Sequence, residues 1–206
     1  MGAERVPQLV ALLGSLSAAA LFTYIVIALP NRLMLSEYVH VPGGLVPFVC
    51  GLLALAVGTS AVARLVQAHG GPAVSVLRVC TAASVVTAAF PTDPTRSAAT
   101  SLSGQVHRWA AAVVFLGLPL AGWLVARGSA TGSARAVRCV VAASALATAM
   151  TLLLNPLSPL ADVIGHPGWE GGFQRMLAAA DVVLVGAIAA GHRRLVGDHH
   201  VDHIGW

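Results

Sequence analysis

The sequence contains very little charge and no lysine. Charged residues make up 10% of its 206 residues, whereas a soluble domain carries about 25%. All twelve basic residues are arginine, and aromatic residues make up only 5% of the chain. Basic and aromatic residues are not interleaved as they are in nucleic-acid-binding surfaces, so we expect no nucleic-acid partner. The scarcity of charge excludes an ordinary soluble domain, and the hydrophobic share of 57% indicates a membrane protein.

Cysteine is also scarce. The three cysteines, Cys50, Cys80 and Cys139, all fall within apolar stretches. A disulfide framework would place pairs of cysteines in the outer loops instead. We therefore expect small packing residues and no disulfide bonds.

Long apolar runs are what the sequence has in abundance. About 20 apolar residues are needed to cross a bilayer as a helix, and continuous helices satisfy every backbone group internally. Six runs of this kind occur, at 7–30, 44–66, 73–91, 106–126, 134–155 and 172–191. These runs predict an all-α, polytopic membrane protein with six transmembrane helices in a compact bundle over 1–192 and a short tail over 193–206. The fifth run is rich in small residues, so we expect it to lie centrally.

The distribution of arginine predicts the orientation. Although "SLSAAA" at 15–20 resembles a signal-peptide cleavage site, the apolar run continues past it, so we expect a retained span. With six spans, eight arginines fall on the side of the termini and four on the other. The positive-inside rule then places both termini in the cytoplasm. Because exclusive use of arginine is typical of high-GC bacteria, we expect a bacterial inner membrane.

Polar groups concentrate in the three outer connections, 31–44, 91–108 and 155–175, each of which combines proline with an acid and a histidine. Because these connections are short, their polar groups can converge near one rim. Asp93 and His107 could share a proton across the hairpin, which suits general acid-base catalysis, or could form a structural hydrogen bond that closes it. Glu37 is a supporting catalytic candidate. The alternative for all of these residues is that they are solvated loop residues and helix caps.

Other groups on this rim are candidates for binding substrate or metal. We expect Arg175 to hold an anionic headgroup, and the candidates that would bind substrate beside it are His166, Tyr38 and Trp169. His40, His107 and His166 could bind zinc as three imidazoles with an open fourth position. The spacing from Ser36 to His40 also resembles the Ser-x-x-x-His of alkaline-ceramidase-type membrane hydrolases. Their later His-x-x-x-His occurs here only in the tail, on the opposite side.

Two charged residues lie inside the predicted spans, Arg78 in the third and Asp181 in the sixth. A lone charge in hydrocarbon is costly. We therefore predict a buried ion pair between Arg78 and Asp181 that holds these two helices together. The functional alternative is a proton or substrate relay.

Four short motifs carry a family resemblance. "LSEYVH" follows the first span, "FPTD" and "VHRWAA" flank the second outer connection, and "GGFQRM" opens the last span. Together they resemble the domain-of-unknown-function-998 family of bacterial six-helix membrane proteins. The resemblance implies a six-helix domain in which Asp93, His107 and Arg175 match characteristic polar positions, and it implies no particular activity. The combination of Glu37 with His40 departs from the family pattern.

These observations favour a protein with an outward-facing polar pocket that binds or processes a small amphiphile, such as a membrane lipid or an isoprenoid. Acid-base or metal-assisted chemistry would be the enzymatic form of this function. A non-catalytic scaffold or accessory subunit is the alternative. A small transporter is a third, less favoured because the spans are not broken in the middle by glycine and proline.

Overall fold

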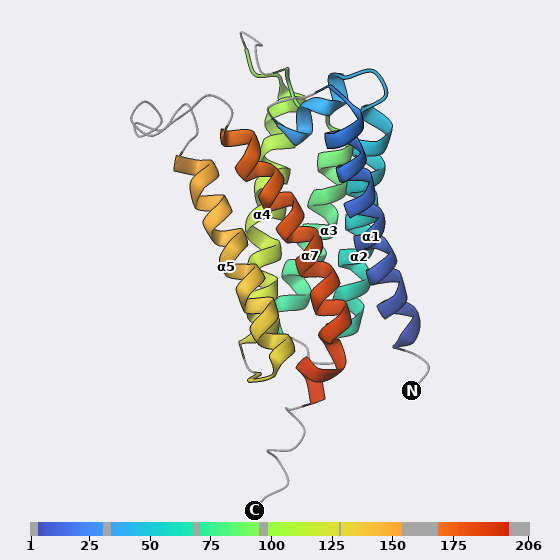
Figure 1. Ribbon diagram of the computed structural model, residues 1–206, viewed down its shortest axis with the longest axis vertical. Coiled ribbons are helices and arrows are strands. Elements are labelled where there is room, and N and C mark those ends of the chain that lie inside the picture. The colour runs from blue at the N-terminus through green and yellow to red at the C-terminus, as the bar shows by residue number, and fades with distance from the viewer. Residues whose placement is uncertain are drawn as a thin grey trace, which may run out of the picture.

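Six long helices and one short 3-10 helix make up the part of the chain that the structure describes. The computed structural model describes residues 4–30, 34–67, 71–94, 99–127, 129–153 and 169–197. The elements are α1 (Arg5–Ala28), the 3-10 helix η1 (Leu35–His40), α2 (Leu45–Val66), α3 (Pro72–Ala89), α4 (Leu102–Ala126), α5 (Gly132–Leu153) and α7 (Trp169–Gly197). The described residues contain no β-strand. The long helices run side by side along one axis, and α7 crosses the front of the bundle diagonally (Figure 1).

All six long helices are long and apolar enough to cross a membrane, which confirms the predicted all-α, six-span fold. The boundaries differ from prediction by a few residues, for local reasons. Helix α3 ends at Ala89 because Pro91 cannot continue it. Helix α4 begins at Leu102, earlier than predicted, because the Ser101 side chain caps it by accepting a hydrogen bond from the backbone N–H of Gly104 at 3.0 Å.

Large apolar side chains point outward from the bundle, as a lipid environment requires. Leu16 is 66% exposed and Ile27 is 78% exposed, although both lie within the α1 span. The inner faces instead use small residues that let backbones approach. A Cβ atom at Gly14 of α1 would lie 2.7 Å from the Ala54 carbonyl oxygen of α2. The glycine therefore sets how closely these two helices pack.

Helix α5 lies at the edge of the bundle, so the prediction of a central fifth helix is wrong (Figure 1). Only 22% of the residues in an 18-residue apolar stretch of α5 are buried, against 50% in the corresponding stretch of α2. It packs mainly on α7 and α4. Its small residues permit a close approach on one face, but they do not require neighbours on every side.

The described ends of the chain, at α1 and α7, lie at the same end of the bundle (Figure 1). Near this end, Gln8 of α1 donates a hydrogen bond from Nε2 to the Ala189 carbonyl of α7 at 3.0 Å. Helix α7 continues through Gly197, five residues into the stretch that we expected to be a tail.

The three cysteines are free, as predicted. Cys80 is fully buried and fits the expectation of a packing residue, with its sulfur against Gly117 of α4. Cys50 and Cys139 are exposed on the outer face of the bundle, so the packing prediction is wrong for these two.

Candidate functional site

At the end of the bundle opposite the chain termini, α7 and the segment that follows α3 are joined to η1 by hydrogen bonds. The backbone N–H of Leu35 donates to Oε1 of Gln174 in α7 at 2.9 Å. His40 contacts the carbonyl oxygen of Thr92 at 2.8 Å, and because a carbonyl only accepts, Nε2 of His40 is the donor. The described parts of the three outer connections therefore do meet at one rim.

His107 is held by the end of α3. The Thr87 carbonyl would normally accept from the backbone nitrogen four residues later, but that residue is Pro91, which has no N–H. Nδ1 of His107 contacts this carbonyl at 3.1 Å and the Phe90 carbonyl at 2.8 Å. Both partners are acceptors, so Nδ1 carries the proton and Nε2 of the neutral ring is an acceptor. No hydrogen bond joins Nε2 to another described residue.

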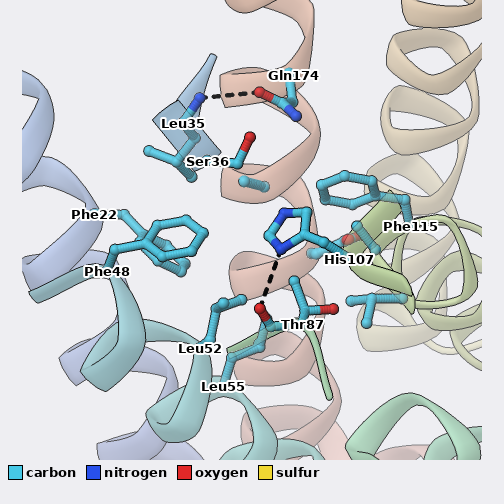
Figure 2. Close-up of a pocket in the computed structure, with 14 residues that line it drawn as sticks. Phe22, Leu35, Ser36, Phe48, Leu52, Leu55, Thr87, His107, Phe115 and Gln174 are labelled. Atoms are coloured by element: carbon cyan, nitrogen blue, oxygen red, sulfur yellow. Dashed lines mark hydrogen bonds between the residues drawn. The ribbon is translucent and has the colours of Figure 1, made fainter. Parts of the chain in front are cut away.

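The imidazole of His107 lines an internal space that we call the inner cavity. Its ring is 4% exposed and stacks near Phe48, with ring centroids 6.4 Å apart. Figure 2 shows it between Phe48 and Phe115, with Ser36 on one side and Leu52 and Leu55 on the other. The cavity is small: its volume is about 40 Å³, and part of it is open to the exterior. Its described lining residues are Phe22, Leu35, Ser36, Phe48, Leu52, Leu55, Thr87, His107, Ala111, Val114, Phe115, Gln174, Ala178 and Asp181.

A second space, the lateral groove, lies between the C-terminal half of α1 and the N-terminal half of α7. Its volume is about 300 Å³, and it is more open than the inner cavity. Its described lining is Ala19, Phe22, Thr23, Val26, Ile27, Leu35, Arg175, Ala178, Ala179, Val182 and Val183. Phe22, Leu35 and Ala178 line both spaces, so these three side chains form a shared wall between the cavity and the membrane-facing groove.

The predicted ion pair between Arg78 and Asp181 is not formed. Asp181 is 0% exposed, and its Oδ1 accepts a hydrogen bond from the Ser144 hydroxyl of α5 at 3.2 Å. Its Oδ2 has no hydrogen-bond partner among the described residues. Arg78 points outward from α3, because Leu77 beside it occupies the buried face and successive helical residues are about 100° apart.

The predicted hydrogen bond between Asp93 and His107 is also absent, because each has other partners. Oδ2 of Asp93 accepts from the backbone N–H of Ser101 at 3.0 Å, and the carboxylate lies against Gly104. Hydrogen bonding from Ser101, and secondarily the charges of Arg108 and His40, lowers the pKa of Asp93 below its usual value. Asp93 therefore supports the start of α4 as a cap, which is the alternative to a catalytic role given in the sequence analysis.

The remaining candidates take varied positions. Oε2 of Glu37 accepts from the Met34 N–H at 3.0 Å and so caps η1. Tyr38 is 0% exposed and is not among the described lining residues of either space, so its contact with substrate stays a prediction. Arg175 lines the lateral groove. Trp169 begins α7, but its side chain, like the whole of His166, lies outside the described residues.

The predicted zinc ligands are not brought together within the described part of the chain. No group of three His, Cys, Asp or Glu side chains with metal-binding geometry occurs among the described residues. His40 and His107 each donate one ring N–H to a backbone carbonyl, and the third expected ligand, His166, lies outside the described residues.

Comparison with known families agrees with the sequence motifs. The model of a family described as "Protein of unknown function (DUF998)" matches residues 13–191. The chain belongs to the DUF998 family. No curated protein and no solved structure gives a match to it. The DUF998 match extends from the first half of α1 to the C-terminal half of α7 and thus includes every described residue of both spaces.

Two features of this DUF998 protein were not predicted from its sequence. One is the contact of His107 with the end of α3, for which a signal exists: Thr87 precedes Pro91 by four residues, which leaves a carbonyl without its helical donor. The other is the Ser144 partner of Asp181. Nothing in the spacing of Ser144 distinguishes it from other small residues of α5.

Proposed function

We propose that this DUF998 protein binds a small amphiphile, a lipid or an isoprenoid, with its polar end beside His107 and its apolar chain against the shared wall. The observation that carries this proposal is the Nε2 acceptor of His107, which faces an otherwise largely apolar cavity beside a lipid-facing groove. Ligand sites typically combine an apolar lining with a few polar groups that fix orientation.

The lateral groove supports entry from the membrane. It lies between two transmembrane helices, and apart from Arg175 and Thr23 its described lining is apolar. An acyl or isoprenoid chain can therefore remain in contact with apolar surface while the polar end passes Phe22 and Ala178. This path avoids exposing the chain to water.

The proposed setting is a bacterial cytoplasmic membrane with both termini in the cytoplasm, as the arginine distribution favours. In this orientation the rim formed by η1 and the start of α7 faces outward. The inner cavity and the lateral groove then draw their ligand from the outer leaflet.

Acid-base processing of the bound amphiphile is a second candidate, favoured by the fixed tautomer of His107. An unprotonated Nε2 can accept a proton from a ligand hydroxyl or from water. In this form of the function, incubation with the native lipid extract yields a changed lipid. The His107→Asn variant, which lacks the Nε2 position, yields none.

The binding proposal is tested by narrowing the passage between the inner cavity and the lateral groove at the shared wall. Ala178→Leu introduces a larger side chain between the cavity and the groove, whereas Ala190→Leu adds the same atoms at an exposed position of the same helix. Each protein is purified in detergent, and the bound lipids are identified by native mass spectrometry and extraction. Wild type and Ala190→Leu should retain a specific amphiphile that Ala178→Leu loses. Equal retention by all three proteins, or none by wild type, would refute the proposal.

A further inference from the structure

Asp181 is a fully buried acid at mid-span. It is the eleventh residue of the candidate span Gly171–His192, and at 1.5 Å per residue it lies about 15 Å from either end. It also lines the inner cavity, on the same face of α7 as Gln174 and Ala178. The cavity thus extends about two helical turns inward, from the rim to the middle of the membrane.

No side chain of the described protein neutralises this acid. Neither arginine nor histidine forms an ion pair with Asp181 among the described residues, and the chain has no lysine. The described lining of the inner cavity contains no arginine, because Arg175 lines only the lateral groove. An ionised carboxyl at this depth is costly without a counter-charge, and Asp181 is one of the residues that line the inner cavity.

When Asp181 is ionised, its Oδ2 and Nε2 of His107 are both hydrogen-bond acceptors without a partner in the described protein. Nε2 of His107 is an acceptor, since Nδ1 donates to the end of α3. The Ser144 hydroxyl occupies Oδ1 of Asp181, while Oδ2 is 0% exposed and lacks a partner in the described protein. A ligand that supplies hydrogen-bond donors and positive charge would therefore be complementary to the ionised form of Asp181 and to Nε2 of His107.

We infer that the amphiphile is a cationic one, a primary amine on an apolar chain, whose ammonium group binds between Asp181 and His107. This inference rests on the proposed function and specifies its ligand class. An ammonium has three donors and no acceptor, so in this position it would donate to both protein acceptors and neutralise an ionised Asp181. Its chain leaves past Phe22 and Ala178 into the lateral groove.

The test compares three probes of equal chain length, dodecylamine, 1-dodecanol and dodecanoic acid. Binding of each to the full-length protein in nonionic detergent is measured by native mass spectrometry over a range of concentrations. We expect wild type to bind dodecylamine about tenfold or more tightly than 1-dodecanol, because its ammonium makes charge-assisted hydrogen bonds. Dodecanoic acid, whose charge repels Asp181, should bind most weakly.

Two variants test whether the preference for the amine over the alcohol depends on the charge of Asp181. Asp181→Asn retains an acceptor for Ser144 but removes the charge, so it should bind the amine and the alcohol equally. Ser144→Ala leaves the carboxyl in place and should keep the preference for the amine. Equal binding of amine and alcohol by wild type, or an unchanged preference in Asp181→Asn, would overturn the inference while leaving amphiphile binding intact. Failure of wild type to bind any probe would count against the proposed function as well. The wild-type comparison decides the matter even when a variant does not fold.

Discussion

His107 combines a structural role at Nδ1 with a cavity-facing acceptor at Nε2, and two substitutions separate these roles. In His107→Asn the side-chain amide nitrogen can take the place of Nδ1 and donate to the Thr87 and Phe90 carbonyls. In His107→Gln the longer side chain reaches the place of Nε2, and the donor to the α3 carbonyls is lost. Both variants remove the imidazole ring, so its packing against Phe48 is lost in each.

The difference in stability between the two variants therefore reports the hydrogen bonds to the end of α3. A buried acceptor left without a donor costs about 1–3 kcal/mol, while side-chain hydrogen bonds within membrane proteins average about 0.6 kcal/mol. Pro91 leaves the Thr87 carbonyl without a helical partner. We therefore expect the free energies of unfolding of the two variants to differ by about 1–2 kcal/mol, a value between these limits. His107→Gln should be the less stable protein.

The free energy of unfolding can be measured by titrating the purified proteins from mild detergent into SDS and following helical content by circular dichroism. Amphiphile binding should show the opposite order, since His107→Asn has no polar atom at the Nε2 position. Equal stability of the two variants would refute the assignment of Nδ1 as the donor. Stronger amphiphile binding by His107→Asn than by His107→Gln would refute the role of Nε2.

Two further predictions concern the start of α4. Gly104→Ala should destabilise the protein by about 1–3 kcal/mol in the same SDS titration, since the added methyl group would overlap the Asp93 carboxylate. The control is Gly172→Ala in α7, where a Cβ meets nothing within 4 Å. This variant should be neutral or slightly stabilising. Asp93 has a lowered pKa in the folded protein, so its stabilising effect is complete above the unfolded pKa of about 3.9 and is lost as the pH falls through the lower folded pKa. Wild type should therefore lose more stability than Asp93→Asn on acidification from pH 6 to pH 3, and parallel losses measured by thermal unfolding would contradict the capping role.

The fold could be predicted from sequence because a single physical quantity, apolar length, determines where a chain crosses a membrane. The six spans depend on about 20 residues each, so errors at single positions have little effect. The helix ends depend on individual residues, as Ser101 and Pro91 show. Their effect is local, which explains why the predicted boundaries were only a few residues away.

The contacts within the site depend on how each helix is rotated and on which partner each polar atom meets. Arg78 and Asp181 have compatible depths, but Arg78 points away from the bundle. Asp93 and His107 are close along the hairpin, yet backbone groups of Ser101 and Phe90 are better-placed partners. Sequence spacing limits which residues can be near one another, whereas hydrogen-bond pairing is decided by geometry that a single sequence does not specify.

The contact between Cys80 and Gly117 has an experimental consequence. The thiol is fully buried between α3 and α4, whereas Cys50 and Cys139 lie on the outer face. Replacing those two with serine would leave one native thiol, whose rate of alkylation measures how often these helices part. A ligand that holds the bundle closed would slow this labelling, giving an optical or mass readout of occupancy without any introduced probe site.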